Sequence, residues 1–366
     1  EIDAVVSVLR GPRLSLGPKM EEFEALVCDM TGQQFGIAVS SGTAGLHLCI
    51  RGLGIGPGDE VIVPSFTFVA AANAARYEGA TPVFADIEPR TLNLDPASVE
   101  ASITPRTRAI IVVHTFGCPA EMGAILDIAG RHGLQVIEDA CEAIGAEYQG
   151  EPVGSFGDAA VFAFYPNKQI TTGEGGMVVT GDARLAREIR AMRNHGRYDT
   201  DAWHQHSILG YNYRLSEIAC ALGCAQIRRL DEILARREQV ARQYDALLLD
   251  VPGLMLPPLE LTDSRNSRIS WFVYVVRLAS HLGRAQRDAV VCTLQEQGIA
   301  CGRYFAPIHS QPAYADLPLR QPLSVTEAVS ERTIALPFFT RMDDADVRRV
   351  AEALAEALLE CEQAGL

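Results

Sequence analysis

The residue that most clearly suggests chemistry is Lys168, because the chain almost lacks lysine. Lysine occurs only at Lys19 and Lys168, which leaves 30 arginines among the 32 basic residues. A guanidinium stays protonated and cannot form an imine, whereas a lysine amine can. Lys168 also stands between an apolar run (residues 159–164) and the glycines at 173, 175 and 176. This position after a buried strand predicts imine chemistry at Lys168, although Lys19 shows that rarity alone assigns no function.

The sequence SSGTAG at residues 40–45 is a candidate phosphate-binding loop. It joins an apolar extended stretch, residues 37–39, to a helix. A helix N-terminus offers free backbone N–H groups and the positive end of the helix dipole, and small residues let a phosphate approach them. The same residues also suit an ordinary serine or threonine cap, so the loop needs support from elsewhere in the chain.

Asp139 gives that support together with Lys168. It ends the run QVIED at residues 135–139, and ligands of open α/β sheets bind at the carboxyl ends of the strands. A pyridoxal phosphate ring bound at Lys168 needs a carboxylate facing its nitrogen, because the protonated ring is the electron sink. A helix-capping role is the alternative for Asp139. Together the three features predict a phosphate cradle, an imine lysine and a pyridinium partner in one α/β domain.

Other ligand-binding motifs fail on their context. The glycines of residues 52–58 are spaced GxGxGxG and lead from a helix into a strand, whereas a dinucleotide-binding fingerprint leads from a strand into a helix. The sequence contains no GxxxxGK[ST] motif, so P-loop phosphoryl transfer has no support. His204 and His206 have no third ligand at a useful spacing, and no metal site is predicted.

Length and composition favour a cytoplasmic protein of two or three domains. The 366 residues are 48% hydrophobic, and the net charge of −14 argues against nucleic acid or an anionic membrane as the main partner. The nine cysteines are odd in number and scattered, which favours a reduced compartment. No apolar run approaches the roughly 20 residues of a membrane span. The chain begins at Glu1 without methionine, which is compatible with removal of an N-terminal segment.

Alternating apolar runs and helical stretches predict an α/β fold with a mostly parallel central sheet. Strands are expected at residues 61–63, 82–85, 109–113, 135–138, 159–164 and 177–180, and helices at 43–51, 68–77, 122–132, 183–193 and 215–249. Proline and glycine at 252–253 and 257–258 predict a boundary between a large domain, residues 1–250, and a smaller α/β domain, residues 251–366. The smaller domain is expected to contain a strand at 271–278, a helix at 284–297, an extended stretch at 299–305 and a helix from 343.

Over essentially its whole length the chain resembles the DegT/DnrJ/EryC1/StrS family of sugar aminotransferases, which have pyridoxal phosphate fold type I. The matching motifs are SGTAGL at 41–46, GDEVIVP at 58–64 with FTFV at 66–69, VIEDA at 136–140, the Lys168 segment and GYNYRL at 210–215. Residues 161–176 and the segment around Asn212 are most similar to 4-aminotransferases of the GDP-perosamine synthase type.

The resemblance implies a role for each matching residue. Lys168 would form the imine with pyridoxal phosphate, Asp139 would pair with the ring nitrogen, and Phe68 would lie against one face of the ring. The cofactor phosphate would be bound by Gly42, Thr43 and Ala44, and by Asn212 of the neighbouring subunit. The active site would thus be completed in a homodimer, and an isologous twofold dimer is also the general default.

Two positions depart from common patterns in the family. Many members have a serine that binds the phosphate where this chain has Ala163, so that hydrogen bond must be absent or replaced. Many members place glutamine or histidine near the ring where this chain has Glu142, a glutamate shared with members of the perosamine type. The Glu142 carboxylate would tune the cofactor or the keto-sugar, and a solvated glutamate after a strand is the alternative.

The implied reaction is a ping-pong transfer of an amino group from L-glutamate to a nucleotide-linked keto-sugar, a 4-keto-6-deoxyhexose for the perosamine type, with Lys168 as general base and acid. The candidates for binding the diphosphate are Arg193, Arg197, Arg214 and Arg303. His309 lies in a stretch that approaches the sugar nucleotide in relatives.

Other functions stay open at this point. A non-catalytic regulatory protein can use the same fold to bind a ligand, and an aminotransferase of this type can act on a keto-cyclitol. A deoxygenating dehydratase is disfavoured, because those relatives have histidine in place of the lysine that this chain keeps at Lys168.

Overall fold

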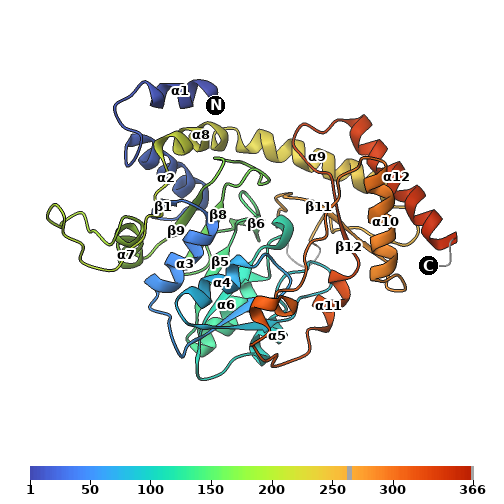
Figure 1. Ribbon diagram of the computed structural model, residues 1–366, viewed down its shortest axis with the longest axis horizontal. Helices are drawn as coiled ribbons and strands as arrows, with labels where there is room; N and C mark the ends of the chain where they lie inside the picture. Colours follow the sequence, from blue (N-terminus) through green and yellow to red (C-terminus); the bar gives the residue numbers. More distant parts are fainter. Residues whose placement is uncertain (262–265, 364–366) are drawn as a thin grey trace.

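The computed structural model describes residues 1–261 and 266–363, and its larger part is built on a seven-stranded sheet (Figure 1). The strand order is β1-β9-β8-β5-β4-β2-β3. Neighbouring strands from β3 to β8 pair in parallel, whereas β9 is antiparallel to β8 and to β1. The strands are β1 (Phe35–Val39), β2 (Glu60–Pro64), β3 (Thr81–Ala85), β4 (Thr107–Val113), β5 (Gln135–Asp139), β8 (Ala159–Ala163) and β9 (Gly176–Thr180). The predicted α/β class with a mostly parallel sheet is confirmed.

Helices cover both faces of this sheet, because its strands are apolar on both sides. One face packs against α3 (Gly42–Gly52), α4 (Ala70–Tyr77) and α7 (Ala183–Arg193). The other face packs against α2 (Pro18–Thr31), α5 (Pro96–Ala101), α6 (Met122–His132) and α8 (Glu217–Ile227). The N-terminal helix α1 (Ile2–Leu9) lies outside these layers, against α8 (Figure 1).

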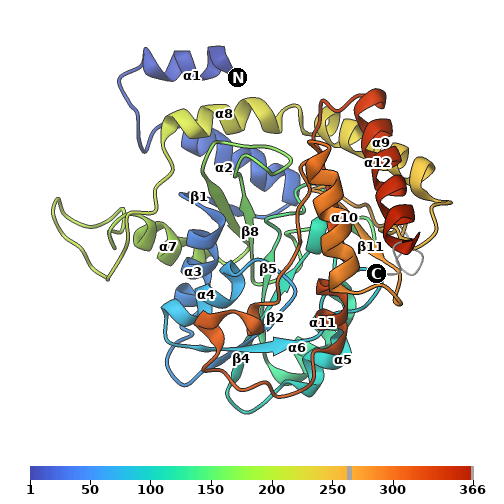
Figure 2. The same ribbon diagram turned by 45° about the vertical axis from the view of Figure 1, so that its right-hand side comes forward.

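A smaller antiparallel sheet forms the core of the C-terminal part (Figure 2). Its strands are β10 (Leu254–Met255), β11 (Tyr274–Leu278) and β12 (Thr333–Leu336). They share one apolar cluster with α10 (Arg284–Glu296), α12 (Asp344–Gln363) and the C-terminal half of α9 (Leu230–Leu248). The remaining short elements are η1 (Thr115–Gly117), β6 (Glu147–Tyr148), β7 (Glu151–Pro152), η2 (Ile308–Ser310), η3 (Pro312–Tyr314) and α11 (Ser324–Ser330).

Residues 308–330 return from the C-terminal part to the large sheet. Ile308, Tyr314 and Leu323 belong to the same apolar cluster as α3 and α4. The two cores are therefore connected both through this segment and through α9. The domain boundary near residue 250 stays a prediction.

Three elements differ from their predicted form. The long helix expected over 215–249 is two helices, α8 and α9, because Arg228 and Arg229 form a turn between them. The helix expected from residue 68 begins at Ala70, which leaves Phe68 in the preceding loop. The extended stretch at 299–305 forms a single bridge, between Gly302 and Ala335.

Candidate active site

A cavity of about 440 Å³ lies at the carboxyl ends of the parallel strands, as expected for an open α/β sheet. Val113, Asp139 and Ala163 end β4, β5 and β8 and line it. The N-terminus of α3 and the loop before α4 complete the large-sheet side, and Phe272, Tyr304 and Phe305 close it from the C-terminal part. Lys168 points into this space.

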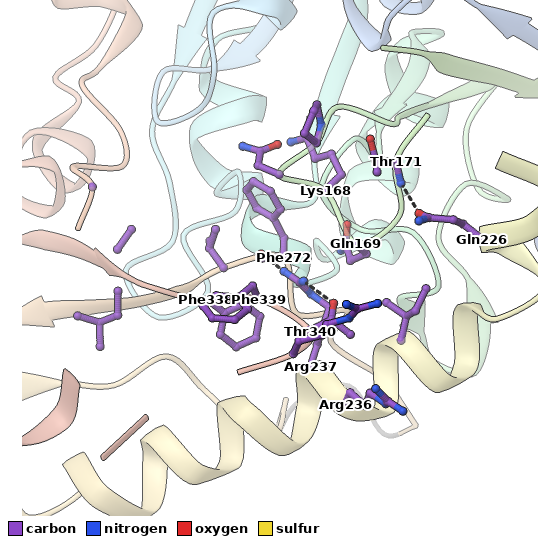
Figure 3. A pocket seen from close by; sticks show the side chains of 18 of the residues that line it. Lys168, Gln169, Thr171, Gln226, Arg236, Arg237, Phe272, Phe338, Phe339 and Thr340 are labelled. Carbon is purple, nitrogen blue, oxygen red and sulfur yellow. Dashed lines mark hydrogen bonds between the residues drawn. The ribbon is translucent and has the colours of Figure 1, made fainter. Parts of the chain in front are cut away.

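Lys168 is placed by the loop that follows β8. Its backbone N–H donates to Tyr165 O at 2.9 Å, and the N–H of Thr172 returns to Phe164 O at 3.0 Å. The N–H of Thr171 donates to Gln226 Oε1 of α8 at 2.7 Å (Figure 3). These bonds fix a tight turn directly after a buried strand, so the lysine projects from a rigid base.

The amine of Lys168 faces a buried carboxylate. Lys168 Nζ lies 3.5 Å from Glu142 Oε1 and 4.0 Å from the centre of the Phe272 ring. The other oxygen of Glu142 accepts the backbone N–H of Phe116 at 2.9 Å. Burial raises the pKa of Glu142, and the charge of Lys168 is the strongest influence in the opposite direction. Glu142 is thus a buried part of the cavity, not a solvated surface residue.

Asp139 is a second buried carboxylate, and its charge has no hydrogen-bonded cation. Among the described residues, only Cys141 donates a hydrogen bond to it, from the backbone N–H at 3.2 Å. Burial raises the pKa of Asp139 above its ordinary value, while Cys141 and then the charges of Lys168 and His114 act to lower it. A protonated ring nitrogen beside Asp139 would supply the missing cationic partner.

The start of α3 presents unpaired N–H groups to the cavity. Ser41 caps the helix by accepting the N–H of Ala44 at 3.1 Å, so the serine cap and the loop predicted to bind phosphate coexist. Among residues 1–261 and 266–363, no acceptor bonds the N–H of Gly42 or Thr43. A Cβ at Gly42 would lie 2.7 Å from Cys141 Sγ and 2.9 Å from Ala163 Cβ, which explains why this position needs glycine.

Phe68 lies on the cavity wall and is not a core aromatic. It precedes α4 and is 61% exposed, whereas most phenylalanine side chains are buried. Such an exposed ring in a cavity indicates that the cavity binds an apolar group. A planar ring inserted beside Phe68 would cover this apolar surface.

These groups fit pyridoxal phosphate. An imine-forming amine, a buried carboxylate that lacks a cation, free N–H groups at a helix N-terminus and an exposed aromatic face all border one cavity. Gly42, Thr43, Phe68, Asp139, Glu142 and Lys168 line it, and Ala44 is the residue whose N–H binds the Ser41 cap. The helix N-terminus would hold the phosphate and Lys168 the aldehyde carbon.

The structure places other candidate residues outside this cavity. His309 Nδ1 bonds to Ser65 Oγ at 2.7 Å, and its Nε2 lies 3.5 Å from Glu327 Oε1. Asn212 is exposed on the loop that pairs with Asn194, and it does not line the cavity of its own chain. The exposed position of Asn212 leaves it accessible to a second subunit.

None of the four arginines proposed for the diphosphate lines the cavity around Lys168. Arg193 is buried and engaged by Glu24 at 2.6 Å, a structural ion pair. Arg303 pairs with Asp288 at 3.0 Å, and Arg214 donates to Asn194 Oδ1 at 3.0 Å. The guanidinium of Arg197 lies over the Trp203 ring.

Sequence reasoning missed the aromatic wall of the site. Phe116 has a positive φ of 57° and stacks on Tyr304 and Phe305, and Phe272 lies under the lysine. Phe116 is more than 150 positions from Phe272, Tyr304 and Phe305 along the chain, so no local spacing could have joined it to them. Their assembly depends on the C-terminal part packing over the sheet.

The described part of the chain contains no cluster of three or more potential metal ligands. Within the same residues, no helix is long and apolar enough to cross a membrane.

Comparison with known proteins shows what the chain is related to. The sequence model of the DegT/DnrJ/EryC1/StrS aminotransferase family matches residues 1–355. GDP-perosamine synthase from Caulobacter vibrioides is 44% identical over 345 residues, 94% of this chain and 91% of that protein. DesV from S. venezuelae, solved with a ketimine intermediate, has a TM-score of 0.90 and 37% identity, over 97% of this chain and 93% of that one. Spr1654 from Streptococcus pneumoniae, in its PMP form, has a TM-score of 0.92 and 26% identity, over 98% and 96%. The chain belongs to the DegT/DnrJ/EryC1/StrS aminotransferase family.

Proposed function

We propose that this pyridoxal-phosphate-dependent aminotransferase moves the amino group of L-glutamate to a nucleotide-linked keto-sugar, a 4-keto-6-deoxyhexose. The observation that carries the proposal is the Lys168 amine, held between the buried Glu142 carboxylate and the Phe272 ring in a cavity that also contains Asp139. The 44% identity to GDP-perosamine synthase supports a sugar-nucleotide acceptor.

When bound, pyridoxal phosphate supplies a pyridinium ring that withdraws electrons from the α-carbon of the amino donor. Asp139 would hold the proton on the ring nitrogen. Lys168 Nζ would take the proton from the donor α-carbon and return it at the other end of the transfer, as general base and then general acid. The keto acid formed from the donor would leave before the acceptor reacts, and Lys168 would serve both half-reactions, so ping-pong kinetics are expected.

The remaining residues would bind and orient. The N–H groups of Gly42 and Thr43 would hold the phosphate, and Phe68 would pack against one face of the ring. Glu142 would fix the position of the lysine amine through its contact at 3.5 Å. Phe272, Tyr304 and Phe305 would exclude water from the reacting atoms.

We also propose that the working form is a homodimer. Asn212 is exposed beside the aromatic pair Tyr211 and Tyr213, whose rings stack at 4.9 Å. Glu78 accepts a hydrogen bond from Tyr211 at 3.0 Å and so fixes the loop from one side. Asn212 would reach the phosphate in the partner subunit, which would give each site residues from both chains.

The test is a screen of GDP-, UDP- and dTDP-linked 4-keto and 3-keto sugars, together with a keto-inositol, as acceptors for the amino group of L-glutamate. Release of 2-oxoglutarate with one sugar nucleotide supports the proposal. Turnover with the keto-inositol alone would mean that the acceptor is a cyclitol and not a sugar nucleotide. Protein that binds pyridoxal phosphate but releases no keto acid with any acceptor would instead be a ligand-binding protein.

A further inference from the structure

Figure 3 shows a second cavity, of about 450 Å³. It adjoins the first cavity at Lys168. Lys168, Phe272 and Tyr304 line both cavities. The second cavity extends from the lysine loop towards α9 and the turn that follows β12. A molecule that reacts at Lys168 can therefore extend into this space.

The interior of this cavity contains a buried guanidinium that forms no ion pair with a carboxylate of residues 1–261 or 266–363. Arg237 is 4% exposed and donates to Trp271 O at 2.6 Å, Phe272 O at 2.6 Å and Thr340 Oγ1 at 3.1 Å. All three acceptors are neutral, and burial lowers the pKa of Arg237 to about 10. Three of its five N–H groups are used in these bonds, which leaves one on each terminal nitrogen. A carboxylate accepts such a pair in the bidentate arrangement.

The other cations of the cavity differ in how far they are already neutralised. Arg229 pairs with Glu1 at 2.9 Å and with Glu232 at 3.1 Å, and Arg236 pairs with Glu232 at 2.8 Å. Arg341 is exposed at the rim and has no ion pair with any residue that the structure describes. The uncompensated charge is therefore one guanidinium in the interior and one at the edge.

Lys168 and Arg237 line the same cavity, and both contact Phe272. Lys168 Nζ lies over the ring of Phe272, and Arg237 Nη2 contacts the carbonyl oxygen of the same residue. An amino acid that reacts through its amine at Lys168 and carries a carboxylate at the end of its side chain can extend that carboxylate towards Arg237 in the same cavity. Phe338, whose ring lies 4.8 Å from the Arg237 guanidinium, gives the cavity an apolar wall for methylene groups.

We infer that this second cavity binds the side-chain carboxylate of a dicarboxylic amino donor, with Arg237 in its interior and Arg341 at its rim. The inference rests on the proposed function, because it assumes that an amino donor reacts at Lys168. The diphosphate of the sugar nucleotide is a competing oxyanion, but it carries at least two charges and needs several converging cations. Here Arg229 and Arg236 are already engaged, and one carboxylate matches the single interior guanidinium.

The test compares L-glutamate with L-glutamine, which has the same shape without the charge. Single-turnover experiments that follow the decrease in cofactor absorbance give kcat/KM for each donor in the wild type and in Arg341→Gln. The variant should lower kcat/KM for glutamate about tenfold and leave the value for glutamine unchanged, since one charge-assisted hydrogen bond is lost. Arg237→Lys, which keeps the charge and loses the planar fork, should lower the glutamate value further. Arg242→Gln, on the outer surface of α9 where Arg242 pairs with Glu238, is the matched control.

A binding measurement separates recognition from turnover. Calorimetric titration of the holoenzyme with glutarate should show binding that weakens about tenfold in Arg341→Gln, while butyrate should bind to neither protein. Because Arg237 also donates hydrogen bonds to two backbone carbonyls, circular dichroism must show that Arg237→Lys is folded. If that variant is unfolded, the result for Arg341→Gln alone tests the assignment of the cavity.

Three results have distinct meanings. Equal preference for glutamate in the wild type and both variants would overturn the assignment of the second cavity. An increase in KM for the sugar nucleotide, with the glutamate reaction unchanged, would assign the arginines to the diphosphate and also overturn it. A wild-type enzyme that releases no keto acid from any amino donor would refute the proposed function itself.

Discussion

Glu142 connects the amine of Lys168 to the polypeptide backbone of a neighbouring loop. One of its oxygens lies 3.5 Å from Lys168 Nζ, and the other accepts the N–H of Phe116 at 2.9 Å. The charge and the hydrogen-bond acceptor of this residue can be removed separately.

Replacing Glu142 with glutamine should slow the first half-reaction about tenfold and leave the fold intact. Glutamine still accepts the N–H of Phe116 but no longer attracts the ammonium group of Lys168. Glu142→Ala removes both contacts and leaves a buried N–H unpaired, which should lower the free energy of unfolding by about 1–3 kcal/mol. Stopped-flow kinetics and urea unfolding measure the two effects. Equal stability of the two variants would contradict the role given to Phe116.

Lys168→Arg tests whether position 168 needs an amine or only a charge. Arginine keeps a cation beside Glu142, yet its guanidinium cannot form an imine. The variant should therefore lose the absorbance band near 400 nm and the borohydride-reducible link to pyridoxal phosphate, with activity reduced by about 10⁴-fold or more. Lys168→Ala should behave in the same way. A reducible link that persists in either variant would mean that another residue binds the cofactor.

Asp139→Asn should keep the link between Lys168 and the cofactor while slowing the half-reaction by about 10²-fold or more. Asparagine has nearly the same shape, but it cannot stabilise a proton on the ring nitrogen, so the ring withdraws electrons less strongly. The absorbance spectrum reports retention of the link, and single-turnover rates with glutamate report the loss. An unchanged rate would exclude Asp139 as the partner of the ring nitrogen.

Ionised Glu60 should stabilise the fold, and this stabilisation should be lost at acidic pH. Burial alone would raise its pKa, but hydrogen bonds from Arg320, Thr104 and Arg106 outweigh burial and hold the pKa at about 2. A depressed pKa stabilises the fold above the ordinary value of about 4.5, and this stabilisation is lost as the pH falls towards 2. Glu60→Gln should therefore lower the free energy of unfolding by about 3 kcal/mol at pH 7 and by clearly less at pH 3.5. Urea titrations at both pH values measure this, and a constant difference would refute the ionic origin.

Subunits with different defects test whether Asn212 acts across a dimer interface. Lys168→Ala and Asn212→Ala proteins should each have low activity alone. When they are mixed and allowed to exchange subunits, a hybrid dimer has one site with both residues intact, so about a quarter of wild-type activity should return. Asn194→Ala, which alters the residue bridged to Asn212, is a matched control for loop damage. If a hybrid dimer forms and activity does not recover, Asn212 acts in the active site of its own subunit.

The sequence by itself determined the groups that are proposed to do the chemistry. Local sequence is enough to recognise Lys168, Asp139 and the loop at residues 40–45. Short stretches of apolar, acidic and small residues specify where strands end and helices begin. The α/β class with a mostly parallel sheet follows from the same local signals, and the structure confirms it. The order of the strands within the sheet was not predicted. Glu142, three residues after Asp139, was singled out only through the family resemblance.

The tertiary structure decided what surrounds these groups. Phe116, Phe272 and Tyr304 come together only because the C-terminal part folds over the sheet, and long-range packing of this kind has no local signature. The same packing buries Arg237 without a carboxylate partner among the described residues, in a cavity that Lys168 also lines. Local sequence therefore specifies which atoms can react, whereas packing between distant segments decides which charges stay uncompensated and available to a substrate.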